Sequence, residues 1–177
     1  MKKIIVIIFG SMVLSFQSCA SQVYMDPANI ERLVNDKNFS FMAQRANPTN
    51  VDVINIANSI PNYGSGRMLN LDYGYTLELK NGELISTLPY FGRSYSTRTF
   101  DPEKQGLRFT SKNYTIDKSI TKKGNTMLRI KPNDINYINT IYIEIYKNGK
   151  AFVSFDASDR QPISFDGYLM KNEELKK

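Results

Sequence analysis

Strict alternation of apolar and polar residues in one stretch constrains the fold of this chain more than any other feature. From residue 69 to residue 80 every second side chain is apolar: Leu69, Leu71, Tyr73, Tyr75, Leu77 and Leu79. Side chains of a strand point alternately to the two faces of a sheet, so this period predicts a half-buried antiparallel strand. Asn81-Gly82 follows directly and favours a tight hairpin turn. We therefore expect Glu83–Leu88 to form the return strand.

The same period of two recurs along the rest of the chain. A second hairpin is expected around Asn148-Gly149. Further strands are predicted at Phe39–Gln44, Val51–Asn58, Leu107–Phe109, Tyr114–Ile120, Met127–Ile130, Ile138–Lys147, Ala151–Asp156 and Ile163–Leu169. About eight to ten strands with local turns indicate a mainly β fold. We expect an antiparallel meander, either curled into a barrel or folded as a two-layer sandwich.

One short helix is predicted before the first strand. Asp26 can cap it, and Pro27 suits the first helical position. Its apolar face would consist of Ile30, Leu33 and Val34. The helix should end between Asn35 and Asn38 and cover one end or edge of the sheet.

The first 18 residues have the pattern of a signal peptide. A basic start, Met1-Lys2-Lys3, precedes the largely apolar run Ile4–Phe16. That run is shorter than the roughly 20 residues a transmembrane helix needs. We therefore divide the chain into a signal peptide at 1–18, a tether and short helix at 19–38, a β domain at 39–170 and a frayed tail at 171–177.

Cys19 is the predicted site of lipidation. Phe16-Gln17-Ser18-Cys19 resembles a lipobox, in which the cysteine thiol is acylated and becomes the new N-terminus. The alternative is ordinary cleavage after Ala20, which would release a soluble exported protein. Because several acyl chains anchor a protein firmly, we expect attachment to the membrane through acylated Cys19. The expected location is the cell envelope at the outer membrane, on its periplasmic or surface face.

The composition removes several classes of chemistry. The 177 residues include no histidine and one cysteine. This excludes histidine-dependent zinc sites, Ser-His-Asp and Cys-His catalysis and an internal disulfide. Asp72 and Glu78 share the polar face of the strand at 69–80 but lie roughly 20 Å apart at about 3.4 Å per residue. We expect no enzymatic activity, no metal site and no cofactor.

The segment Leu88–Tyr95 is the first candidate binding site. Tyr90, Phe91 and Tyr95 offer aromatic rings, and Arg93 offers a forked donor. Together they could hold a sugar, a peptide or an anionic headgroup. The structural alternative is a corner with inward-packed rings, in which Arg93 pairs with a carboxylate.

Arg160 is a further candidate binding residue, next to Asp159 between two predicted strands. The structural alternative for Arg160 is an exposed ion pair with Asp156 or Asp166.

A basic stretch runs from Arg93 to Lys131. It holds ten basic residues and three acids, which favours an anionic envelope ligand such as a phospholipid headgroup, or else a protein partner. The alternative is a solvated basic face. Removing Lys2 and Lys3 with the leader lowers the formal net charge from +6 to +4. This mild balance does not indicate nucleic acid as a partner.

Several short motifs occur in order along the chain: Asn38-Phe39-Ser40-Phe41, Leu88-Pro89-Tyr90-Phe91-Gly92-Arg93-Ser94-Tyr95, Gly106-Leu107-Arg108-Phe109, Asn113-Tyr114 and 158–167. With them the chain resembles the bacterial domain-of-unknown-function family 4251 over roughly Phe39–Leu169. The resemblance implies a small secreted or lipid-anchored protein and carries no activity to any residue.

We therefore expect a non-enzymatic, lipid-anchored binding or interaction module. One alternative is a barrel that carries an apolar ligand in a cavity behind Leu71, Tyr73 and Tyr75. A second is a hydrolase that uses carboxylates and tyrosine. A third is a structural assembly subunit with a large apolar patch or an open sheet edge.

Overall fold

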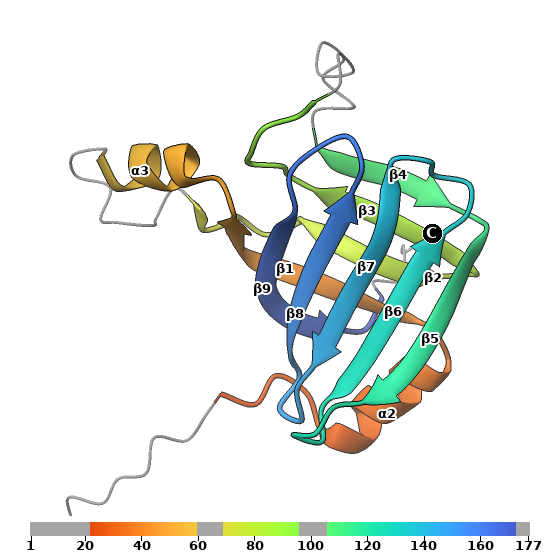
Figure 1. Ribbon diagram of the computed structural model, residues 1–177. Coiled ribbons are helices and arrows are strands. Elements are labelled where there is room, and N and C mark those ends of the chain that lie inside the picture. The colour runs from red at the N-terminus through yellow and green to blue at the C-terminus, as the bar shows by residue number, and fades with distance from the viewer. Residues whose placement is uncertain (1–21, 60–68, 96–105, 173–177) are drawn as a thin grey trace, which may run out of the picture.

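The computed structural model, which describes residues 22–59, 69–95 and 106–172, contains one nine-stranded antiparallel sheet. The sheet curls into a nearly closed barrel (Figure 1), which confirms the mainly β prediction and decides between its two forms. The strands are β1 (Phe39–Pro48), β2 (Thr76–Lys80), β3 (Glu83–Leu88), β4 (Leu107–Ser111), β5 (Tyr114–Ile120), β6 (Thr126–Pro132), β7 (Ile138–Ile145), β8 (Lys150–Ala157) and β9 (Ile163–Met170). Their order in the sheet is β4-β3-β2-β1-β9-β8-β7-β6-β5.

The pairing of β1 with β9 joins two meanders into that one sheet. Within β1–β4 and within β5–β9, each strand pairs with its neighbour in sequence. The β1–β9 ladder runs from Ser40 opposite Met170 to Pro48 opposite Ile163. A side chain at Gly167 would overlap the Met42 carbonyl oxygen, so only glycine allows the two backbones to approach this closely.

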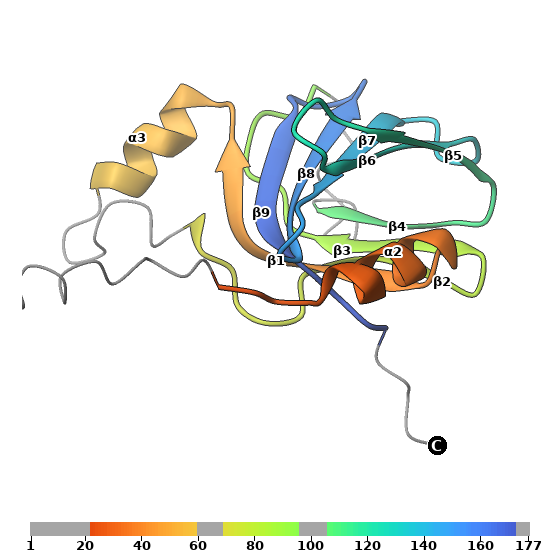
Figure 2. The same cartoon turned by 90° about the horizontal axis from the view of Figure 1, so that it is seen from below.

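Large side chains fill the inside of the barrel. Phe39, Phe41, Phe155 and Phe165 are fully buried, and the last two pack edge to face with ring centroids 6.1 Å apart. The helix α2 (Pro27–Asn35) covers one end of the barrel (Figure 2). It buries its predicted apolar face there, Ile30, Leu33 and Val34.

The local signals for α2 and the two hairpins are confirmed. The Asp26 carboxylate caps α2 by accepting the Ala28 N–H at 2.9 Å. Asn81 and Gly82 link β2 to β3 with φ of 54° and 79°, as the favoured hairpin turn requires. Gly149 has a φ of 83° in the β7–β8 turn.

The strand predicted at Val51–Asn58 is wrong, because this segment forms the helix α3 (Val51–Ser59). The Asn50 side-chain oxygen accepts the N–H groups of Asp52 at 2.8 Å and Val53 at 3.2 Å. Such capping satisfies donors at the first turn that have no partner in a helix. The local cap therefore outweighs the alternating pattern.

The strand predicted from residue 69 begins only at Thr76. Residues 69–75 still follow β1, since Leu71 N–H bonds to Gln44 O and Ala43 N–H bonds to Tyr75 O, both at 2.9 Å. Gly74 has a φ of 111°, a backbone conformation outside the strand region. The alternating pattern therefore begins at Leu69, several residues before regular strand pairing begins at Thr76.

Asp134 fastens the connection between β4 and β5, the two strands at the ends of the sheet. Its carboxylate accepts the Ser111 hydroxyl and the N–H groups of Lys112 at 2.8 Å and Asn113 at 3.2 Å. The hydrogen bond from Ser111 and those from the backbone lower the pKa of Asp134 below 3.8. The ionised carboxylate thus links the β6–β7 turn to the β4–β5 connection, where the two end strands of the sheet meet.

The leader and Cys19 lie outside the described residues, as do Arg98, Lys104 and the tail from residue 173. Among the described residues, no helix has the length and apolar character needed to cross a membrane.

We predict that acid weakens the barrel partly through Asp134. A carboxyl group whose pKa is depressed by folding stabilises the fold above its unfolded pKa, and this stabilisation is lost as pH falls through the folded pKa. The free energy of unfolding, measured by urea titration between pH 7 and pH 2, should therefore fall below about pH 4. Asp134→Asn should lower stability at pH 7 and flatten this fall. An Asp134→Asn protein with an unchanged acid profile would contradict the assignment.

Candidate functional site

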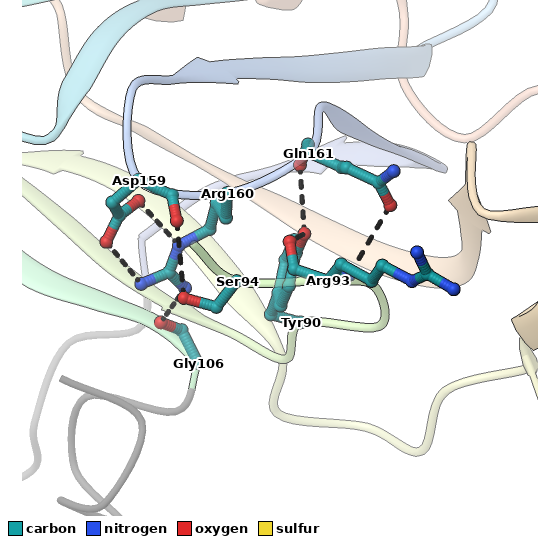
Figure 3. Close-up of polar contacts among 7 residues, drawn as sticks. All are labelled: Tyr90, Arg93, Ser94, Gly106, Asp159, Arg160 and Gln161. Carbon is teal, nitrogen blue, oxygen red and sulfur yellow. Dashed lines mark hydrogen bonds and ion pairs between the residues drawn. The ribbon is translucent and has the colours of Figure 1, made fainter. Parts of the chain in front are cut away.

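The predicted binding segment at 90–95 packs against the β8–β9 loop at one end of the barrel (Figure 3). The Tyr90 hydroxyl lies within hydrogen-bonding distance of the carbonyl oxygens of Arg93, at 2.8 Å, and Gln161, at 3.1 Å. Backbone bonds run from Gln161 N–H to Arg93 O at 3.0 Å and from Tyr95 N–H to Asp159 O at 2.7 Å. Burial raises the pKa of Tyr90 above 10.0, so its hydroxyl stays protonated as a donor. The two loops therefore form one rigid unit, the rim cluster (residues 90–95 and 159–161).

Arg160 is the charged centre of the rim cluster and is only 4% exposed. Its guanidinium binds the Asp159 carboxylate at 2.9 and 3.1 Å and the Gly106 carbonyl oxygen at 2.9 Å. The Tyr90 ring lies 4.9 Å and the Tyr137 ring 5.8 Å from the guanidinium carbon. The predicted pairing of Arg160 with Asp156 or Asp166 is wrong, because Arg160 pairs with the residue just before it, Asp159.

The outer part of the rim cluster faces solvent. Arg93 pairs with Asp52 of α3 at 2.8 Å, and both side chains are about two-thirds exposed, at 69% and 66%. This is the contact that the structural alternative predicts for Arg93. Tyr95 is exposed, whereas Phe91 is partly buried against the core. Of the five candidate binding residues, Arg93 and Tyr95 therefore present the most surface to a ligand.

A groove of about 490 Å³ lies on the outer face of the sheet, over β1, β2 and β3. Its apolar lining comes from Met42, Met170, Ile85 and Tyr73, and its polar lining from Ser40, Thr76, Glu78, Lys80, Asn81 and Glu83. Sequence reasoning missed this groove. The signal for it is Met42, an apolar residue at a position where the alternation of β1 calls for a polar one.

The described part of the predicted basic stretch runs along β4, β5 and β6, and several of its charges have partners. Lys112 pairs with Glu83 at 3.1 Å, at the edge of the groove. Lys118 binds the Asn35 side chain at 2.7 Å near α2. Asp117 lies opposite Arg129 in the β5–β6 ladder.

Comparison with known protein families agrees with the resemblance in the sequence motifs. Residues 24–169 match the model of the family described as Domain of unknown function (DUF4251). This chain belongs to the DUF4251 family. No curated protein matches it in sequence. The matched region begins at Tyr24, so α2 and the residues just before it belong to the domain together with the barrel.

The described part of this DUF4251 chain contains no group of three metal-ligating side chains. The groove does bring Glu78 and Glu83 together, but both are engaged. Glu78 accepts the Thr76 hydroxyl at 2.8 Å, and Glu83 pairs with Lys112. Each of these groove carboxylates therefore has a partner within the fold.

The two arginine pairs of the rim cluster should differ sharply in their contribution to stability. Arg160→Met leaves the Asp159 carboxylate, whose side chain is 9% exposed, without its partner, which should cost about 3–5 kcal/mol of unfolding free energy. Arg93→Ala removes an exposed pair and should cost about 0–1 kcal/mol. Urea denaturation of both variants measures the difference. Equal losses would show that Arg160 does not hold the rim cluster together.

Proposed function

We propose that this protein is a lipid-anchored envelope protein that binds a partner protein and catalyses no reaction. The groove over β1–β3 is the observation that carries the proposal. Its volume lies in the range of about 300–1,000 Å³ that is typical of ligand sites. The barrel interior is filled by side chains such as Phe41 and Phe165, which favours the outer groove over an internal cavity for an apolar ligand.

The lining of the groove fits an extended peptide segment of the partner. Met170 and Ile85 offer partly exposed apolar side chains, while Met42 is only 3% exposed. Methionine is a flexible residue common at binding surfaces that accept varied apolar groups. The lining holds two carboxylates, Glu78 and Glu83, and one lysine, Lys80, and Lys112 pairs with Glu83 from the edge of the groove. A peptide with an apolar side chain next to a basic one would complement this lining.

Acylation of Cys19 is the second part of the proposal. The lipobox-like sequence before Cys19 supports it. The first described residues begin three positions after Cys19, at Gln22. The chain would therefore pass from the acylated cysteine almost directly into the folded domain.

Replacing Cys19 tests the anchor. In cells that make the protein, we expect the native chain in the membrane fraction and its N-terminal peptide to carry the mass of attached acyl chains. Cys19→Ala should move the protein to the soluble fraction or leave its leader uncut. An unmodified N-terminus after Ala20 in the native protein would rule out the anchor.

A peptide library selected against the purified mature protein tests the groove. Selected peptides should share an apolar residue next to Lys or Arg. Ile85→Lys places a charge in the groove lining and should weaken their binding by at least tenfold, or about 1.4 kcal/mol. Tyr142→Lys, on the exposed outer face of β7, should leave binding unchanged. Equal binding to both variants would remove the groove as the site.

Turnover assays on the same protein test the absence of catalysis. Incubation with envelope glycans, phospholipids and peptides should yield no product above that of a heat-unfolded sample. Reproducible turnover of any of these substrates would replace a binding function with an enzymatic one.

A further inference from the structure

The residues that lead out of the domain toward Cys19 lie on the β7–β8 turn. Tyr24 N–H donates to Asn148 O at 2.8 Å, and the Asn148 side-chain amide donates to Gln22 O at 3.2 Å. The Tyr24 ring stacks on Tyr168 of β9, with centroids 4.6 Å apart. A Cβ atom at Gly149 would lie 2.8 Å from Met25 N. Residues 22–25 are therefore held against this end of the barrel.

The lower end of the barrel in Figure 1 gathers α2, the β5–β6 turn, the β7–β8 turn and residues 22–25. The two turns touch, since a Cβ atom at Gly124 would lie 3.4 Å from Lys147 Nζ. The rim cluster lies at the opposite end, where β8 passes into β9. We call the lower end, with residues 121–125 and 146–150, the turn face.

The turn face exposes four lysines: Lys122, Lys123, Lys147 and Lys150. Neither turn contains an acid. Among the described residues, no ion pair joins any of these lysines to a carboxylate. Glu144, the nearest acid before Lys147, accepts the Asn125 side-chain amide at 2.7 Å.

Other residues at this end complete the surface. The acids near the turn face include Asp26 at the N-cap of α2, Glu31 within that helix, and Glu144 and Asp166, whose charges act on Tyr146. Ile120 and Val23 are 63% and 66% exposed next to the lysines. Lysines around exposed aliphatic side chains are typical of surfaces that meet the headgroup region of a membrane.

We propose that the turn face lies against anionic phospholipid headgroups of the membrane that holds the anchor. The orientation rests on the proposed acylation of Cys19. Gln22 lies three positions after Cys19, a stretch that spans at most about 11 Å when fully extended. An acyl chain in the bilayer therefore keeps the β7–β8 turn close to the headgroups, and the four lysines carry the complementary charge. The rim cluster then points away from the membrane.

Sedimentation with vesicles tests headgroup binding apart from acylation. The probe is the mature chain with Cys19→Ser, which keeps every described residue, mixed with vesicles of phosphatidylcholine containing 0–40% phosphatidylglycerol. We expect binding to rise with the phosphatidylglycerol fraction. Each lysine removed from the turn face should weaken binding about fivefold.

A matched pair of variants locates the contact. Lys122→Gln/Lys123→Gln should weaken vesicle binding about 25-fold, whereas Arg129→Gln/Lys131→Gln, an equal loss of charge on the outer face of β6, should change it less than twofold. Circular dichroism confirms that both variants fold. Equal weakening by both pairs, or by neither, would overturn the proposal. Because the probe carries no acyl chain, this result does not depend on whether Cys19 is lipidated in cells.

Discussion

The filled interior is the constraint on which the rest of this structure depends. Aromatic side chains from β1, β8 and β9 meet inside the curled sheet, and α2 closes one end. Burial of apolar area is the main favourable term in folding. This chain buries its apolar area only when the meanders β1–β4 and β5–β9 face each other across a common core. Because the buried rings of Phe39, Phe41, Phe155 and Phe165 occupy this interior, binding surfaces are expected on the outside, in the groove over β1–β3, at the rim cluster and on the turn face.

Much of this fold could be predicted from local signals in the sequence. Asn81-Gly82 and Asn148-Gly149 each mark a hairpin, and alternation marks most strands. The failure at Val51–Ser59 has a specific cause: an alternating pattern does not reveal that the Asn50 side chain caps a helix. The order of strands also lay beyond local reasoning, because the β1–β9 ladder joins residues more than a hundred positions apart.

The candidate site was predicted less well, for a related reason. The sequence indicates that Tyr90, Arg93 and Arg160 are unusual residues, but not that Arg160 is buried and bound to Asp159 and Gly106. A cluster of aromatic and basic residues is equally compatible with a ligand site and with a structural junction. The groove depends on the outward side chains of strands and a turn brought together by the fold, such as Met42 and Tyr73. Their proximity follows from strand register, which composition and spacing do not determine.

The β1–β9 ladder has a consequence for how the chain reaches its native state. Synthesis proceeds from the N-terminus, so β1 emerges long before its partner β9. Until then one edge of β1 lacks hydrogen-bond partners, and such an edge can pair with other chains. Closing so long a loop is slow relative to forming the hairpins. The nascent domain should therefore pass through a stage with two separate meanders, and its yield should depend on whatever shields that edge while the last strand arrives.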